Sequence, residues 1–190
     1  MKMSVRTTLA SLLLVVAVAG WAPAPAGAQS LEEFNQSRDE ITFAAMGVLA
    51  GWSAVNLAVG TTLSFFAEDP VLRGFHQMNA GWNVVNAALA VPGLIGSSAR
   101  LASPPELGTA ESLQTQNTLE DVLLFNAGLD LAYMASGLYL IERSRRGEAN
   151  AAQLEGFGYS LILQGGFLFV FDLVVYFIQR SNFSRVEPIL

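Results

Sequence analysis

The sequence predicts an all-α fold: a four-transmembrane-helix bundle after a cleaved N-terminal signal peptide. Two observations lead to this prediction. Hydrophobic residues make up 52% of the 190 residues and charged residues only 14%, an unusual balance for a water-soluble domain. The apolar residues also come in long blocks separated by short charged stretches, as expected when lipid surrounds the helices. We therefore expect a single four-span membrane domain over residues 29–190.

Residues 1–28 have the three parts of a secretory signal peptide. The basic residues Lys2 and Arg6 come first, an apolar run follows, and the small residues Ala-Gly-Ala at 26–28 form a cleavage site before Gln29. The alternative is a retained anchor helix. The apolar run is shorter than the roughly 20 residues that a span needs, which favours cleavage.

The first predicted span covers residues 41–67 and contains no acidic or basic residue. It is long enough to cross the hydrocarbon of a bilayer with some tilt. Before it, Ser30 and Glu33 have the spacing of a capping box, which predicts an exposed helix start. The Glu-Asp-Pro sequence at 68–70 should end this first helix, because proline cannot donate a backbone hydrogen bond.

The second predicted span covers residues 75–97, and Pro92 should kink or end its helix. The stretch 98–121 is rich in Ser, Pro, Thr, Gln and Glu, so we expect a long outside loop there. Near its end, Thr118 resembles a helix cap before the third span.

The third and fourth predicted spans cover residues 122–142 and 156–179. The interior of each contains one charged residue, Asp130 in the third and Asp172 in the fourth. Neither run alternates polar and apolar residues as the strands of a membrane barrel do. Both are therefore expected to be helices.

Removal of a signal peptide leaves the mature N-terminus outside, and four spans return the C-terminus to the same side. This places Arg143, Arg145 and Arg146 in the cytoplasm, in agreement with the positive-inside tendency. The sequence thus predicts a multi-pass protein of the bacterial inner membrane whose mature N-terminus and C-terminus both lie outside.

The first two spans share a short motif. Residues 51–58 and 81–88 match at Gly, Trp, Val, Asn and Ala, and both copies lie near mid-span. Two equal motifs at equal depth in antiparallel spans would be related as inverted repeats, although so few matches could also arise by chance. Because Asn is costly in hydrocarbon without a partner, Trp52, Asn56, Trp82 and Asn86 should point inward.

Polar residues recur at helical spacing inside the spans and predict a buried polar seam. Its candidate residues are His76, Asn79, Asn83, Asn86, Asn56, Asn126, Asp130, Gln164 and Asp172. Two interpretations remain open for the amide side chains: hydrogen bonds between helices, worth about 0.6–2 kcal/mol each, or the lining of a cavity for a small polar solute or ion.

Asp130 and Asp172 are the most informative members, because an ionised carboxylate in mid-bilayer costs at least about 2.5–3.5 kcal/mol. Neither span supplies a basic partner. A bound proton, hydrogen bonds from neighbouring side chains or a bound cation could each offset the cost. The structural and functional interpretations remain equally open.

Small residues at four-residue spacing predict faces where helices approach closely. They occur on the first span at Gly47 and Gly51, and on the third at Gly128, Ala132 and Ser136. We expect these faces to be packing seams.

Several functions are disfavoured. The formal net charge of −6 argues against nucleic-acid binding, and the absence of cysteine excludes disulfides, thiolate metal sites and cysteine catalysis. His76 is expected to be solvated or hydrogen-bonded rather than a metal ligand, because metal sites usually need several ligands. No catalytic motif supports an enzyme, and we expect no metal and no cofactor.

At residues 75–83, 85–86 and 164–172 the chain resembles an uncharacterised family of bacterial four-helix integral membrane proteins. The segments concerned read FHQMNAGWN and QGGFLF. The resemblance implies a fold and a location over most of the mature chain, and it implies no activity.

Two function classes follow. The first is a non-enzymatic integral membrane protein of the bacterial envelope that packs with itself or with a membrane partner in the lipid bilayer. The second is a small transporter, channel or sensor that uses the buried Asn and Asp residues, for which four spans would require oligomerisation to enclose a path.

Overall fold

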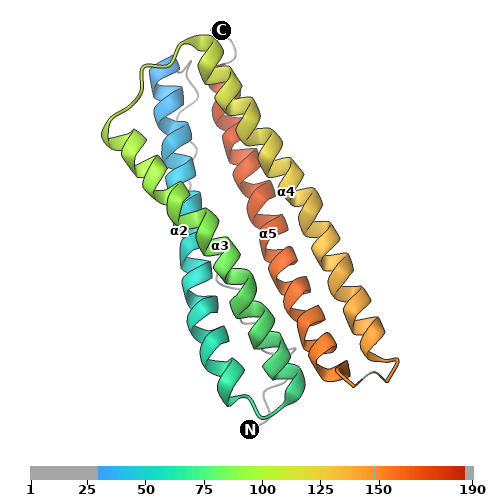
Figure 1. Cartoon of the computed structure of the whole chain (residues 1–190). Helices are drawn as coiled ribbons and strands as arrows, with labels where there is room; N and C mark the ends of the chain where they lie inside the picture. Colours follow the sequence, from blue (N-terminus) through green and yellow to red (C-terminus); the bar gives the residue numbers. More distant parts are fainter. Residues whose placement is uncertain (1–29, 148, 187–190) are drawn as a thin grey trace.

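A computed structural model describes residues 30–147 and 149–186. It contains four helices in this part of the chain: α2 (Leu31–Phe66), α3 (Pro70–Ala102), α4 (Thr109–Ser144) and α5 (Ala151–Val186). They form an antiparallel bundle (Figure 1). Each helix is long and apolar enough to cross a membrane, as the sequence predicts. The predicted signal peptide lies outside the described residues.

The starts of α2 and α3 follow directly from local sequence. The Ser30 hydroxyl accepts from the amide of Glu33 at 3.2 Å, and the Glu33 carboxylate accepts from the amide of Ser30 at 2.8 Å, so the predicted capping box is confirmed. Asp69 caps α3 by accepting from the amides of Val71 and Leu72, with Pro70 at the first helical position. The predicted break between the first two spans is therefore a tight connection.

The predicted loop at 98–121 is mostly wrong. α3 continues through Pro92 to Ala102, and α4 begins at Thr109, so only residues 103–108 are non-helical. Thr118 lies within α4 and caps nothing; the helix is capped at Gly108, whose amide donates to Glu111. The polar residues of this stretch belong to a helix rather than a loop. Ser112, Gln116 and Glu120 recur every four residues, which puts these buried side chains on one helical face.

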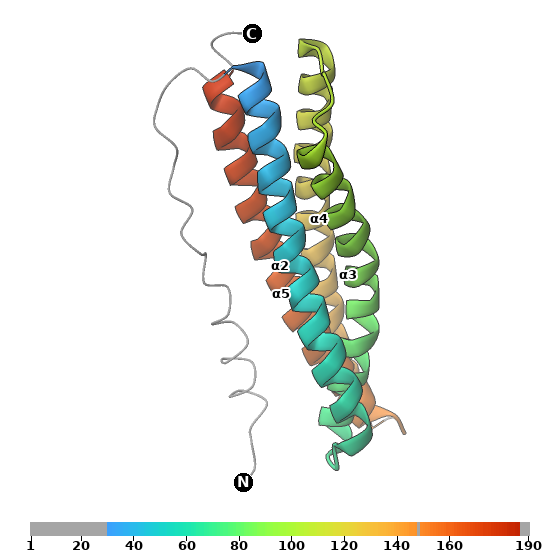
Figure 2. The ribbon, with the colours of Figure 1, turned by 90° about the vertical axis from the view of Figure 1, so that its left-hand side faces the viewer.

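The helices pack as two hairpins, α2 with α3 and α4 with α5, and α3 also packs along α5. α5 has the most buried residues of the four helices. Figure 2 shows the first turns of α2 beside the last turns of α5, so residues 31 and 186 lie at the same end of the bundle. The side-chain Nδ2 of Asn182 donates to the backbone carbonyl of Phe34 at 3.2 Å across this contact.

Close backbone approach occurs at glycines other than those predicted. A Cβ on Gly158 would lie 2.5 Å from the carbonyl oxygen of Gly137, and one on Gly156 would lie 2.5 Å from the amide of Phe75. By contrast, a Cβ on Gly51 or Gly128 would meet nothing within 4 Å. The small-residue faces predicted on α2 and α4 therefore point out of the bundle, so they are not seams between these four helices.

Polar side chains occupy the interior and apolar ones the surface. Among the described residues, the buried polar and charged side chains outnumber the buried hydrophobic ones. Large apolar side chains are exposed on all four helices, among them Val55 on α2, Leu89 on α3, Phe125 on α4 and Phe177 on α5. An apolar exterior of this kind is unfavourable in water and is the distribution that a bilayer stabilises.

Candidate functional site

The buried polar residues form two groups and a pair, which we name here. The inner cluster comprises Trp52, Asn56, Asn79, Asn83, Asn86 and Gln164. The carboxyl pair is Asp130 and Asp172. The outer cluster, at the end where α2 begins and α5 ends, comprises Asn35, Arg38, Thr42, Ser112, Gln116, Glu120, Gln179 and Asn182.

Gln164 of α5 is the centre of the inner cluster. Its Oε1 accepts from the indole Nε1 of Trp52 at 2.9 Å and from Nδ2 of Asn86 at 3.4 Å. Its Nε2 donates to Oδ1 of Asn79. The side chain of Gln164 is fully buried. Through these bonds, this one residue of α5 is joined to both α2 and α3.

The asparagines complete this network. Asn79 donates to Oδ1 of Asn56 at 2.6 Å, and Asn86 donates to Oδ1 of Asn83 at 3.2 Å. The remaining donors of Asn56 and Asn83 reach backbone carbonyls one turn back on their own helices. The amide oxygens of Asn56, Asn79, Asn83 and Gln164 therefore all have donors, as an apolar surrounding requires.

The paired tryptophans make different contacts. Trp52 stacks on Phe167 of α5 with ring centroids 3.8 Å apart and planes 4° apart. Trp82 meets Tyr133 of α4 edge-on at 4.6 Å, and its buried Nε1 has no hydrogen-bond partner in the described part of the chain. Both rings pack against the other hairpin, and only Trp52 joins the polar network.

The carboxyl pair lies between α4 and α5. The relative exposure of Asp130 is 2% and that of Asp172 is 6%, and the two carboxyl groups lie near enough to influence each other's charge. The backbones of the two helices come close at this level, because a Cβ on Gly165 would lie only 2.8 Å from the carbonyl oxygen of Asp130. The spacing of residues within each helix could not indicate this pairing.

Two of the predicted seam residues stay apart from these groups. His76 is buried near the start of α3, one turn before Asn79, and its ring meets Phe75 edge-on at 5.1 Å. Asn126 is half-buried and takes part in none of the hydrogen bonds among the described residues of the inner cluster. The seam is thus a compact network plus a carboxyl pair rather than a continuous line.

The outer cluster was not predicted from the sequence. Gln116 donates to Glu120 at 2.8 Å and to the carbonyl of Gln179 at 3.3 Å, while Gln179 donates to the carbonyl of Arg38 at 3.1 Å. These bonds join α2, α4 and α5. Their signal was available in the three- and four-residue spacing of polar residues near 35–42, 112–120 and 179–182, had these stretches been treated as helical.

Arg38 is the most unusual member of the outer cluster. Its residue exposure is 2%, and its guanidinium donates to the carbonyl of Ser112 at 3.3 Å and lies 5.5 Å from the centre of the Phe34 ring. Burial lowers the pKa of Arg38, and the nearby charge of Arg100 lowers it further, whereas Asp39 raises it. Asp39 in turn accepts from Nε of Arg100 at 2.7 Å.

An apolar belt separates the two clusters. It comprises Ala45, Leu49, Ala90, Leu123, Phe167, Phe171 and Val175. Along α2 it lies between Thr42 and Trp52, and along α5 between Gln164 and Gln179. Apolar side chains therefore separate the two clusters, and the buried Asp172 lies within the same stretch of α5.

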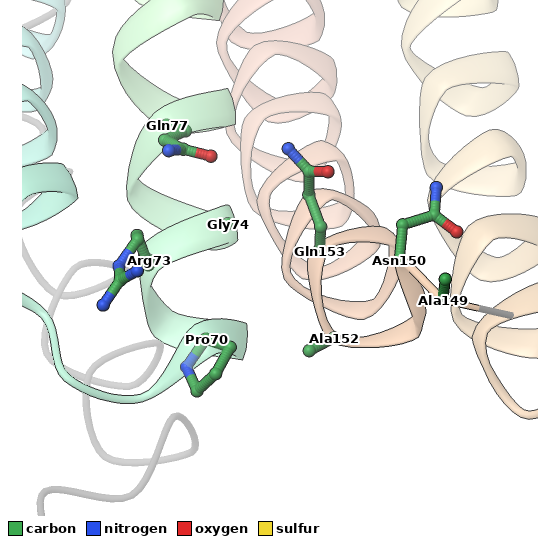
Figure 3. Close-up of a pocket in the computed structure, with 8 residues that line it drawn as sticks. All are labelled: Pro70, Arg73, Gly74, Gln77, Ala149, Asn150, Ala152 and Gln153. Carbon is green, nitrogen blue, oxygen red and sulfur yellow. The ribbon is translucent and has the colours of Figure 1, made fainter. Parts of the chain in front are cut away.

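A cavity of about 340 Å³ lies at the far end of the bundle, between the first turns of α3 and α5 (Figure 3). It is lined by Pro70, Arg73, Gly74, Gln77, Ala149, Asn150, Ala152 and Gln153. Arg73 already donates to the carbonyl of Ala67 through Nε and Nη2. No member of the inner cluster or of the carboxyl pair lines this cavity.

Residues 48–173 match the model of DUF6992, a family of unknown function. The chain belongs to this family. The resemblance to an uncharacterised family is thereby confirmed. Comparison with curated proteins and with solved structures gave no match.

The matched region of this DUF6992 member contains the whole inner cluster and the carboxyl pair. The outer cluster is covered only in part, because five of its residues lie outside the match: Asn35, Arg38, Thr42, Gln179 and Asn182. Chemically, the inner cluster holds neutral amides that satisfy each other. Among the described residues of the matched region, the carboxyl pair is where two buried acidic side chains lie near each other.

Proposed function

We propose that this protein is a non-enzymatic, multi-pass component of the bacterial inner membrane that packs with itself or with a membrane partner. The observation that carries the proposal is the outward position of its small-residue faces. Gly51 and Gly128 are exposed on α2 and α4, with nothing within 4 Å of where a Cβ would be. In lipid, such faces let a helix of another molecule approach closely.

The interior supports a structural role for the polar residues. The hydrogen bonds of the inner cluster close on one another and hold α2, α3 and α5 in a single register. An amide that lined a solute path would need its donors and acceptors free for the solute. The network is therefore better suited to fixing the shape that carries the outward faces.

The association is tested by the oligomeric state of the purified protein in nanodiscs, measured by mass photometry. We expect the wild type to self-associate, and Gly51→Leu or Gly128→Leu to reduce the oligomer. The matched controls are Val55→Leu and Leu131→Val, which change exposed side chains on the same helices without filling a small-residue face. A wild type that is monomeric without a bound partner protein, or oligomers unaffected by the glycine substitutions, would contradict the proposal.

For the orientation, we propose that both ends of the mature chain lie outside. The connection at 145–150, which contains Arg145 and Arg146 and closely follows Arg143, would then be cytoplasmic. The chain has no cysteine, so single cysteines can be introduced cleanly. A membrane-impermeant maleimide added to intact spheroplasts should label Glu106→Cys and not Ala149→Cys. The reverse pattern would invert the topology.

A second candidate function is a small transporter, channel or sensor. The carboxyl pair favours it, because ionisable groups inside membrane helices commonly mark ion or proton paths. Proton or cation flux into proteoliposomes that is lost in Asp130→Asn and Asp172→Asn would support this candidate. The apolar belt predicts that a single copy in the conformation described here shows no flux.

A further inference from the structure

The cavity between the first turns of α3 and α5 is lined by amide side chains that are not used elsewhere in the structure. They are Gln77 of α3, Asn150 just before α5 and Gln153 of α5, and within the described part of the chain their side chains form no hydrogen bond. Figure 3 shows Gln77 and Gln153 on the two sides of the gap. Each primary amide offers two donors and an acceptor oxygen, so these side chains can bind a polar molecule. The amides of the inner cluster, by contrast, bond to one another.

Backbone contact between α3 and α5 fixes the walls of this cavity. A Cβ on Gly74, which lines the cavity, would lie 3.1 Å from the Cα of Gln153. One turn further along α5, a Cβ on Gly156 would lie 2.5 Å from the amide nitrogen of Phe75. The cavity is therefore a preformed feature of this helix pairing. Its volume of about 340 Å³ falls within the range of small-ligand sites.

Arg73 is the one charged residue among those that line the cavity. Its Nε and Nη2 donate to the carbonyl of Ala67 at 3.1 and 2.9 Å, which leaves Nη1 as a donor, and Arg73 forms no ion pair with any described residue. None of the acidic residues described at this end lines the cavity, and Asp69 and Glu155 already accept hydrogen bonds. The charge at the rim therefore favours an anionic ligand.

The cavity lies at the level where lipid headgroups meet the acyl chains. Phe65 and Phe66, at the end of α2, are 78% and 77% exposed, and Ala67, the acceptor for Arg73, follows them directly. Exposed aromatic rings are stable at this boundary and unfavourable in bulk water. The apolar segments 41–67 and 156–179 also end here, just short of residues 149–153. Phosphate groups of phospholipids are concentrated at the same depth.

We propose that this cavity binds a phosphate ester that carries hydroxyl groups, the chemistry of a phosphoglycerol headgroup. The phosphate lies at the rim, where Nη1 of Arg73 donates to it. The hydroxyl groups donate to and accept from the amides of Gln77, Asn150 and Gln153. Basic pockets between membrane helices bind lipid headgroups in this way. A soluble ester shares the chemistry, and binding measurements distinguish the two sources.

Native mass spectrometry of the purified protein in detergent tests the proposal without using self-association or flux. The probes are dioctanoyl phosphatidylglycerol, soluble glycerol phosphate, and dioctanoylglycerol, which has the same tails and no phosphate. We expect the wild type to bind phosphatidylglycerol and not dioctanoylglycerol. Arg73→Gln should weaken this binding about tenfold or more, because it removes a charged donor. The matched control is Arg146→Gln, which removes an exposed charge at the same end and should change the affinity by less than about twofold.

Two further variants leave Arg73 and its bond to Ala67 unchanged. Ala152→Trp places a large ring on the cavity wall and should abolish binding, while circular dichroism reports whether the helices are retained. Gln77→Leu should weaken the binding of phosphatidylglycerol and leave that of dioctanoyl phosphatidic acid unchanged, because phosphatidic acid lacks the headgroup hydroxyls that the amide recognises.

The result for glycerol phosphate assigns the source of the ligand. Affinity equal to that of phosphatidylglycerol would support a soluble ester, and binding of the lipid alone would support a headgroup site. Three results would overturn the proposal: a wild type that binds neither probe, equal losses in Arg73→Gln and Arg146→Gln, or unchanged binding in a folded Ala152→Trp protein. Equal losses would indicate general charge attraction at this end of the bundle.

Discussion

The two polar clusters of the interior differ in how completely they are satisfied. In the inner cluster, the amide oxygens of Asn56, Asn79, Asn83 and Gln164 all accept hydrogen bonds from side chains. In the outer cluster, the buried amide oxygens without partners in the described structure are Asn35 Oδ1, Gln116 Oε1, Gln179 Oε1 and Asn182 Oδ1. The clusters also differ in charge. Ion pairs of Arg100 with Asp39 and of Arg180 with Glu120 lie at the outer end, whereas the side chains of the inner cluster are neutral.

The difference reflects the surroundings of each cluster. α2 begins ten residues before Ile41, and these residues extend about 15 Å beyond the uncharged segment. Water surrounds the bundle at that end and lowers the cost of the charges there, although the four unpartnered oxygens themselves are buried. Hydrocarbon offers no such substitute, so the inner cluster must satisfy itself. The following predictions test this contrast, from the largest expected effect to the smallest.

Gly156→Ala should have the largest effect, because it disrupts the close backbone packing of α5 against α3. The added Cβ would collide with the carbonyl of Val71 and with the amide of Phe75, which are backbone atoms that cannot rotate away. We expect a loss of about 3 kcal/mol in the free energy of unfolding, measured in mixed detergent micelles with increasing SDS. Gly128→Ala, where the Cβ meets open space, should stay within about 1 kcal/mol of the wild type.

Gln164→Leu should cost more than Gln116→Leu, although both residues are fully buried glutamines. The first substitution leaves the Trp52 indole and the side-chain oxygen of Asn79 without partners in hydrocarbon. We expect a loss of about 2 kcal/mol. The second removes two bonds but leaves Glu120 its ion pair with Arg180, so we expect a loss of about 1 kcal/mol. Equal losses in the same SDS titration would remove the proposed distinction between the clusters.

Ser30→Ala should destabilise the first turn of α2 by about 1 kcal/mol, because it removes an N-cap hydrogen bond. The capping box also makes this turn sensitive to pH. Hydrogen bonds with Ser30 lower the pKa of Glu33 below its ordinary value of 4.5. The contribution of the carboxylate is therefore complete above that value and is lost as the pH falls through the lowered pKa. Hydrogen exchange of residues 31–34 should rise in acid in the wild type and not in Glu33→Gln.

Arg100→Gln should have a small effect, about 0.5–1 kcal/mol, because its guanidinium is partly solvated in the ion pair with Asp39. Added salt should diminish the difference from the wild type, since the pair lies outside the hydrocarbon. Arg145→Gln breaks a more exposed pair with Glu142 and should change stability by less. A larger effect at Arg145 than at Arg100 would be inconsistent with the burial of Asp39.

The sequence alone determined the features that depend on neighbours within one helix. The four apolar segments, the capping box at Ser30 and the helix break before Pro70 follow from local composition and backbone chemistry. The polar face of α3 also follows, because three- and four-residue steps align side chains whatever packs against them.

The tertiary structure alone decided which helical faces meet. The exposed Gly51 and the buried Gly158 look equally suited to close approach in the sequence, and only the packing shows that Gly165 admits the backbone of α4 beside Asp130. The outer cluster likewise required knowing that α2, α4 and α5 all continue beyond the apolar segments. The rotation and register of each helix are set by packing against all the others at once, and no single helix carries that information.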